Sequence, residues 1–469
     1  VILNGTVYSG ESRPEILNIG IKGESIKYIG NESISGNESI NAKGYVVTPG
    51  FIDVHTHSDL SFIVDPEADS KLVQGVTFEL MGNCGMSFCS PLSKDNKYQL
   101  QERLNRYGVS KNMDWNNFDD WLNEIQNNTP SINVAAQIGH GNLRSFVMGM
   151  EARHPTPDEL AKMKHEMNKA FDQGVLGFST GLWYAPGSYS SAEEIIELAK
   201  VASKNNILYS SHIRSESDDS SGLFPAHAEA IEIARRSGAR VQISHVKSVG
   251  PKFWGRGYEL IEGIDEARDE GLDVAGDQYP YHWSSTPISG CMFPRWSLEG
   301  GREKTLLRMK DINIRTKIKD ETTNFINRFH GPEGCILADY PYDTDLEGLN
   351  LTEISKEFKT TPEESVMKLY EKSEGSFILH SMDEKDVDEI AKYKYMCVAS
   401  DGNSLRNNGP LSSGKPHPRS YGTNTRFIEQ FVSNKKIVDF EEAIFRMTSY
   451  PAERLSLIHI FRAHETSLP

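Results

Sequence analysis

Short apolar runs that end in polar or glycine-rich residues recur along most of this 469-residue chain, and amphipathic stretches separate them. Such runs predict buried strands, and apolar residues spaced three and four apart predict helices. The expected strands are residues 51–57, 76–84, 132–140, 175–180, 207–212, 241–245, 272–277 and 396–401. The expected helices include residues 157–173, 191–204, 225–237 and 258–270. Eight strands that alternate with helices favour an α/β fold of the TIM type, a (β/α)₈ barrel.

Other segments depart from this rhythm and suggest additional units. Residues 1–48 contain short strands interrupted by Gly, Asn and Ser, which is typical of a small β-sandwich module. The pattern loosens around residues 286–345, which we expect to be an insertion that caps the mouth of a barrel spanning 49–455. A strand-like run at 376–380 brings the number of candidates to nine. One of the nine assignments is therefore wrong or lies outside the barrel.

Residues that can bind metal or move protons stand at the ends of the expected strands. In TIM-type barrels the chemistry lies at the C-terminal ends of the strands. These positions hold His55, His57, Cys84, His140, Ser179, His212, His245, Asp277 and Asp401. Zinc prefers imidazole and thiolate ligands, and a carboxylate beside a metal can transfer protons. Each residue alone is compatible with ordinary packing or turn chemistry, but their gathering at one rim favours a metal site.

The spacing of these residues adds detail. His55 and His57 are two positions apart, so on a strand their side chains project from the same face. Lys247 stands two positions after His245 and is expected to share its face in the same way. The 33 residues from His212 to His245 match one strand–helix repeat, which places these two histidines on neighbouring strands.

Composition narrows the class of protein. The formal charge is 50 − 66 = −16, so nucleic acid and anionic membranes are not expected partners. No run of 18 apolar residues is present, so no membrane span is expected. Five cysteines in so long a chain make no disulfide framework, which favours a reducing, cytoplasmic location.

Several motifs together resemble the amidohydrolase superfamily and, within it, the D-aminoacylase group, the N-acyl-D-amino-acid deacylases. The first is Pro-Gly-Phe-Ile-Asp-Val-His-Thr-His-Ser-Asp at 49–59, which is typical of the whole superfamily. Gly-Asn-Cys-Gly at 82–85 points to the narrower group. The others, in chain order, are Gly-His-Gly-Asn-Leu-Arg (139–144), Gly-Phe-Ser-Thr-Gly-Leu (177–182), His-Ile-Arg-Ser-Glu (212–216), Ile-Ser-His-Val-Lys (243–247), Asp-Gln-Tyr-Pro-Tyr (277–281), Ser-Asp-Gly (400–402) and His-Pro-Arg-Ser-Tyr-Gly-Thr (417–423).

The resemblance implies a zinc-dependent hydrolysis of N-acyl-D-amino acids to a carboxylate and a free D-amino acid. One tightly bound zinc ion would be held by Cys84, His212 and His245. His55 and His57 would form a second, weaker position, with Cys84 as a bridge. Asp401 would be general base and then acid for attack by a zinc-activated hydroxide. The residues expected to bind the substrate are Lys247, Tyr184, Tyr279, Ser285 and Arg419.

Alternatives and open points remain at this stage. A cyclic-amide hydrolase of the dihydroorotase or hydantoinase type is the second enzyme reading, although residues 175–182 lack the lysine that many superfamily members place on strand four. A catalytically inactive binding scaffold is the third. The preferred side chain and acyl group, the number of metal ions and the oligomeric state are left open. Arg214 is expected to do no more than pair with Glu216, and residues 456–469 are expected to be a non-native tail.

Overall fold

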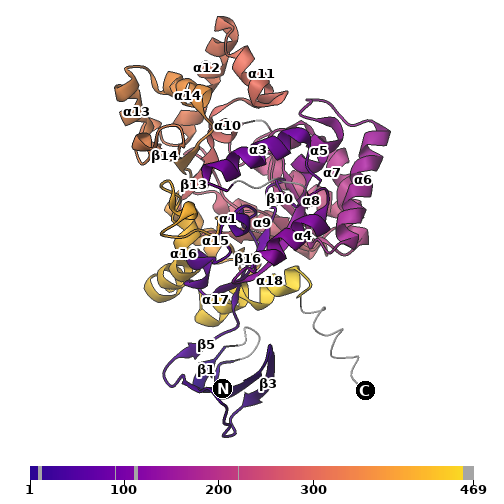
Figure 1. Cartoon of the computed structure of the whole chain (residues 1–469), viewed down its shortest axis with the longest axis vertical. Helices are drawn as coiled ribbons and strands as arrows, with labels where there is room; N and C mark the ends of the chain where they lie inside the picture. The colour runs from indigo at the N-terminus through magenta and orange to yellow at the C-terminus, as the bar shows by residue number, and fades with distance from the viewer. Residues whose placement is uncertain (9–12, 90, 110–114, 220, 458–469) are drawn as a thin grey trace.

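Eight parallel strands form the central barrel in the computed structural model, which describes residues 1–8, 13–89, 91–109, 115–219 and 221–457 (Figure 1). The strands follow one another around the sheet in the order β16-β12-β11-β10-β9-β8-β7-β6, and every neighbouring pair is parallel. Their bounds are β6 (Phe51–Asp53), β7 (Val76–Met81), β8 (Asn133–Gly139), β9 (Gly177–Gly181), β10 (Leu208–His212), β11 (Val241–Ile243), β12 (Val274–Gln278) and β16 (Met396–Val398).

All eight expected barrel strands are confirmed, with shorter bounds at their C-terminal ends in most cases. The ninth candidate also forms a strand, β15 (Ser376–His380), but it belongs to a separate three-stranded sheet. The expectation that His55 and His57 share one face of a strand is wrong, because β6 ends at Asp53 and both histidines follow it. The same holds for His245 and Lys247, which follow the end of β11 at Ile243.

Helices cover the outside of the barrel, as the amphipathic pattern predicts. Those before the insertion are α1 (Ser61–Val64), α2 (Asp69–Leu72), α3 (Lys94–Arg106), α4 (Phe118–Asn127), α5 (His140–Met148), α6 (Pro157–Asp172), α7 (Ala192–Lys204), α8 (Leu223–Ser237) and α9 (Gly257–Asp269). Local sequence explains where α6 begins. The Thr156 hydroxyl accepts from the amide of Glu159, and the Glu159 carboxylate accepts from the amide of Thr156, with Pro157 in the first turn.

An insertion between β12 and β16 folds as a unit with its own core. Its sheet has the order β13-β15-β14 and is antiparallel. Its elements are β13 (Trp283–Pro287), α10 (Ile288–Met292), α11 (Gly301–Arg308), α12 (Ile312–Arg328), β14 (Cys335–Asp339), α13 (Leu351–Phe358), α14 (Pro362–Lys372) and β15. The loosened stretch at 286–345 lies inside this unit, which occupies the end of the molecule opposite the N-terminal module (Figure 1). The Trp183 indole, after β9, donates to the carbonyl of Gly290 and ties the unit to the barrel mouth.

The N-terminal residues form a separate five-stranded sheet. Its strands are β1 (Ile2–Val7), β2 (Glu15–Lys22), β3 (Ser25–Gly30), β4 (Ile40–Asn41) and β5 (Val46–Val47). Each of five isoleucines on this module is more than half exposed: Ile16, Ile21, Ile26, Ile29 and Ile40.

The helices that follow the insertion are α15 (Glu384–Ala391), α16 (Arg419–Phe427), α17 (Phe440–Met447) and α18 (Ser449–Arg454). Helix α16 continues as a π-helix (Ile428–Asn434). Residues 458–469 of the expected foreign tail lie outside the described residues.

A buried ion cluster lies at the seam where β6 and β16 meet. These strands are the two ends of the sheet, and the residues that follow them are joined by the bridge between Thr56 and Gly402 and by neighbouring backbone hydrogen bonds. The Lys71 ammonium lies 2.7 Å from an Asp53 carboxylate oxygen and 2.8 Å from one of Glu79, and all three side chains are fully buried. Lys71 also donates to the hydroxyl of Ser400, next to Asp401. The cluster therefore links the residues before His55 to the residue before Asp401.

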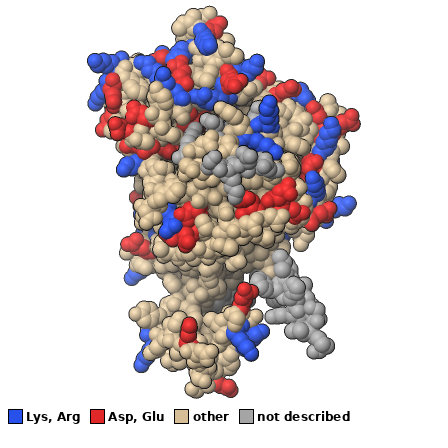
Figure 2. Space-filling model, viewed as in Figure 1, with Lys and Arg blue, Asp and Glu red and all other residues tan. Residues whose placement is uncertain are grey.

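Surface charge and helix hydropathy complete the picture. Basic and acidic side chains are intermixed over the insertion and the barrel flank on the face in Figure 2, and the N-terminal module shows few of either there. Within the described residues, no helix combines the length and apolar character that crossing a membrane requires.

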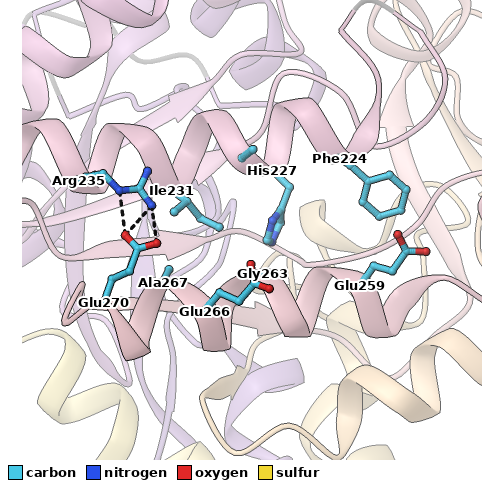
Figure 3. Close-up of a pocket in the computed structure, with 10 residues that line it drawn as sticks. Phe224, His227, Ile231, Arg235, Glu259, Gly263, Glu266, Ala267 and Glu270 are labelled. Carbon is cyan, nitrogen blue, oxygen red and sulfur yellow. Dashed lines mark hydrogen bonds and ion pairs between the residues drawn. The ribbon is translucent and has the colours of Figure 1, made fainter.

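A groove of about 260 Å³ runs along the outer face between α8 and α9, and His227 points from α8 toward Gly263 of α9 (Figure 3). A Cβ atom on Gly263 would lie 3.2 Å from Cε1 of the His227 ring, so the glycine leaves room for the ring. Burial lowers the pKa of His227 to about 4, since a charged imidazole here would lose its hydration. His227 is therefore neutral in the folded protein at neutral pH.

Replacing His227 by leucine is expected to reduce the loss of stability on acidification. The folded pKa of about 4 lies below the ordinary value of 6.5, so protonation favours the unfolded chain. The neutral histidine's contribution to the free energy of unfolding is present above pH 6.5 and is lost as the pH falls toward 4. The loss is about 2 kcal/mol at pH 5. Urea unfolding at pH 7 and pH 5 measures the difference. His165→Leu, on the exposed face of α6, is the control, and equal pH dependence in parent and H227L would contradict the assignment.

Candidate metal centre

Four ligand-type side chains converge where the barrel strands end. One ligand atom each of His55, Cys84, His245 and Asp401 can be chosen so that all four lie within 4.8 Å of one another. The Cys84 sulfur lies 3.4 Å from Nε2 of His55 and 3.5 Å from Nε2 of His245. All four residues are buried. Thiolate, imidazole and carboxylate groups at such separations are the donor set of a zinc site.

His212 lies beside this group and forms a second set of ligand-type side chains with Glu216 and His245. Its ring lies 4.5 Å, centroid to centroid, from the ring of His245. Both of its ring nitrogens are buried, and neither makes a hydrogen bond of normal geometry with the described residues. Buried polar atoms are almost always satisfied, so an orphaned imidazole facing thiolate and imidazole groups fits a missing ligand such as a metal ion.

The backbone that presents Cys84 is held by the neighbouring strand ends. Cys84 has a φ of 54°, in the left-handed region that costs energy for a residue with a side chain. The Ser179 hydroxyl donates to the carbonyl of Gly82 and accepts from the amide of Gly85 at 3.1 Å, so it brackets Cys84 from both sides. A Cβ atom at Gly181 would overlap the carbonyl oxygen of Cys84, which explains the glycine there.

Electrostatics favour the anionic forms of the thiol and the carboxyl. Burial by itself would raise the pKa of Cys84, but the imidazoles of His55 and His245 hold it well below the ordinary value. Burial would likewise raise the pKa of Asp401, and the Arg419 guanidinium with the nearby histidines holds it well below its usual range. Cys84 is thus available as a thiolate and Asp401 as a proton acceptor.

Asp401 connects this cluster to His57 and Arg419. One carboxylate oxygen lies 3.0 Å from Nε2 of His57 and 3.4 Å from Nε2 of His55. The other accepts from the Arg419 guanidinium at 2.7 Å. Arg419 also donates to the backbone carbonyl of Ser285, which lies on β13 of the insertion.

The other residues expected to bind substrate lie around the same centre. Lys247 is buried, and its ammonium lies 2.7 Å from Oε1 of Glu216 and 2.7 Å from Nδ1 of His245. The Tyr184 ring packs 4.8 Å from the ring of His212. The Tyr279 ring lies within 6 Å of both the Lys247 and Arg419 cations, and its buried hydroxyl lacks a hydrogen-bond partner among the described residues.

Two other strand-end residues do not join the metal cluster. His140 lies 2.8 Å from the Glu194 carboxylate, which also accepts from the buried Arg144. Ser179 acts only on the loop that carries Cys84, as described above. Both therefore stabilise the barrel rim rather than face the centre.

One expected ion pair does not form, and two carboxylates with no expected role lie beside the centre. In place of the expected pair with Glu216, Arg214 forms two 2.8 Å contacts with Glu229 on α8. Glu216 instead faces Lys247 and Nδ1 of His245, the latter at 3.0 Å. Asp277 accepts from His55 at 3.1 Å and from the amide of His245 at 2.7 Å. Its position at a strand end was the only sequence signal for Asp277, and nearness to His212 the only one for Glu216.

The sequence is similar to those of known amidohydrolases. The model of the amidohydrolase family (Amidohydro_3) matches residues 38–252. N-acyl-D-glutamate deacylase of Alcaligenes xylosoxydans xylosoxydans is 31% identical over 97% of this chain and 83% of its own length. D-aminoacylase of the same organism is 28% identical over 97% of this chain and 84% of its own length.

The fold is similar to those of solved structures of related enzymes. N-acyl-D-glutamate deacylase of Bordetella bronchiseptica, complexed with zinc and a phosphonate inhibitor that mimics the tetrahedral intermediate, superposes with a TM-score of 0.80. It is 29% identical and is matched over 97% of this chain and 85% of its own. L-hydantoinase of Arthrobacter aurescens reaches a TM-score of 0.50 at 13% identity, over 97% and 82% of the two chains, which is a likeness of fold alone.

Proposed function

Because this chain belongs to the amidohydrolase family and within it to the N-acyl-D-amino-acid deacylases, we propose that it is a metal-dependent hydrolase that cleaves N-acyl-D-amino acids to a carboxylate and a free D-amino acid. The observation that carries this is the gathering of Cys84, two histidines and Asp401 at one barrel mouth, in a chain related to such deacylases over 97% of its length. The target bond is a linear amide.

Zinc is the metal that the donor set favours. Cys84, His212 and His245 would hold one ion, and His55 with His57 would hold a second, weaker one that shares Cys84. The buried, unpartnered nitrogens of His212 support this assignment. A bound zinc ion would polarise the amide carbonyl and make a water molecule more acidic.

Asp401 would carry the protons of the reaction. Its carboxylate is ionised and buried beside the expected metal ligands, so it can take a proton from the attacking water. The same carboxyl would return that proton to the nitrogen as the amide bond breaks, since an amine is a poor leaving group until it is protonated. Contact with Arg419 on the other oxygen keeps the carboxylate in one orientation.

Cationic and hydroxyl groups would receive the substrate's free carboxylate. The Tyr279 ring lies 5.9 Å from the Lys247 ammonium and 5.1 Å from the Arg419 guanidinium. Tyr184 and Ser285 border the same space from β9 and the insertion. Buried cations beside the expected metal ligands would favour a substrate that carries a carboxylate, because charge-assisted hydrogen bonds to a carboxylate are strong.

A screen of amide substrates tests the function. The zinc-loaded chain is incubated with the N-acetyl derivatives of D-glutamate, D-aspartate and D-methionine, with the matching L compounds, and with hydantoin and dihydroorotate. Ninhydrin detects free amino acid, and loss of the rings' ultraviolet absorbance reports ring opening, which releases no free amino acid. We expect release from D substrates, and none from the L compounds or the rings.

Ring opening without release from any D substrate would favour the hydantoinase-type reading instead. Inactivity toward every compound, with zinc bound, would favour the binding scaffold. D-substrate turnover that persists after zinc is removed with a chelator would contradict metal dependence.

A further inference from the structure

Within the described residues, the buried carboxylate of Asp277 hydrogen-bonds to both halves of the proposed metal centre. It lies on β12 and is 1% exposed, and the proposed mechanism gives it no part in binding substrate or moving protons. A single oxygen, Oδ1, accepts from Nδ1 of His55 at 3.1 Å and from the backbone amide of His245 at 2.7 Å. His55 belongs to the weaker half of the proposed centre and His245 to the tighter half.

The first contact decides which nitrogen of His55 is free. Because the Asp277 carboxylate occupies Nδ1, Nε2 is the nitrogen of His55 that remains to face a metal ion. Nε2 is the atom that lies 3.4 Å from the Cys84 sulfur. Ring orientation and ligand atom are therefore both set by Asp277.

The second contact holds a strained backbone. His245 has a φ of 35°, which a residue with a side chain adopts only when its surroundings impose it. Its amide is fixed by Asp277, and its side chain presents Nε2 to Cys84 at 3.5 Å. The other oxygen of Asp277 accepts from the Gln242 side chain at 3.2 Å, so the carboxylate cannot rotate freely.

We propose that Asp277 is a positioning residue that couples the two halves of the metal centre by orienting His55 and His245 through one shared oxygen. This deepens the proposed function, because it rests on the same metal centre. Zinc binding to both halves then depends on Asp277, although Asp277 is not itself a ligand.

Zinc titration of the metal-free full-length chain against a chromogenic chelator tests this proposal without a substrate. Asp277→Ala removes both hydrogen bonds and is expected to weaken zinc binding about 10–100-fold. Asp277→Asn keeps an oxygen at the same place, which can accept both bonds, and is expected to restore the affinity to within a few-fold of the parent. Asp273→Asn is the matched control, since Asp273 precedes the same strand at its opposite end and pairs with Arg454. It is expected to bind zinc like the parent.

The outcomes separate the possibilities. Parent-like zinc affinity in D277A, or an Asn variant as weak as the Ala variant, would overturn the positioning role. Unfolding curves of the metal-free variants show whether D277A is misfolded. If it is, the zinc affinities of D277N and D273N are compared instead, and much weaker binding by D277N would overturn the role. A parent chain that binds zinc but hydrolyses no N-acyl-D-amino acid would defeat the proposed function and leave this test intact.

Discussion

Replacing Asp401 by asparagine is expected to lower kcat on N-acyl-D-amino acids by about 10²–10⁴-fold, with a much smaller change in KM. The amide keeps the size of the carboxylate and can still contact Arg419, but it cannot accept a proton from water. Steady-state kinetics of the parent and D401N on one D substrate measure the effect.

Bound zinc must be measured in the same samples, because Asp401 lies among the metal ligands. Full zinc content with lost turnover identifies a proton carrier, whereas parallel loss of both would make Asp401 a ligand instead. Asp388→Asn, which removes a carboxylate paired with Lys435 on the outside of the barrel, is the control. A D401N enzyme with more than a tenth of parental kcat would contradict the proposed base.

Replacing Lys71 by methionine is expected to lower the free energy of unfolding by about 3–5 kcal/mol. Burial acts to lower the pKa of Lys71, but Asp53 and Glu79 together raise it, so the lysine is charged in the folded state. Without it, two carboxylates share a fully buried space at the barrel seam with no cation. Urea unfolding at neutral pH measures the change.

A double variant distinguishes loss of charge balance from loss of packing. Lys71→Met combined with Glu79→Gln leaves one buried carboxylate rather than two, so part of the stability should return. If K71M unfolds within 1 kcal/mol of the parent, the cluster does not stabilise the seam. If K71M is strongly destabilised and the double variant is no better, packing rather than charge explains the loss.

Elements with strong local patterns were predictable. Strands such as β7 and β16 lie in short apolar runs bounded by polar or glycine residues, and burial on both faces explains why such runs need not alternate. The Thr156–Glu159 capping box explains why α6 starts at the predicted position. β15 has the same local signature as a barrel strand, and only its antiparallel partners in the insertion distinguish it.

The structure brings the expected His55, Cys84, His245 and Asp401 close together, but the sequence does not predict which side chains contact one another there. His57 and Asp401 are 344 positions apart and meet only because β6 and β16 are the two ends of a closed sheet. Glu216 was assigned to Arg214 from sequence nearness, yet α8 supplies Glu229 at 2.8 Å and leaves Glu216 to Lys247. The left-handed backbone of Cys84, His245 and Asp401 has no sequence signature, since none of them is glycine.

The sequence by itself determined the barrel, the ligand types at its rim and the deacylase family, because periodicity and motifs are local properties of the chain. Only the tertiary structure decided which carboxylate contacts which histidine, how Lys71 neutralises the two buried carboxylates at the seam, and which residue of the insertion contacts Arg419. Those relations depend on distances across strands far apart in the chain. A hydrogen bond or ion pair changes strength over fractions of an ångström, and no spacing in sequence encodes that.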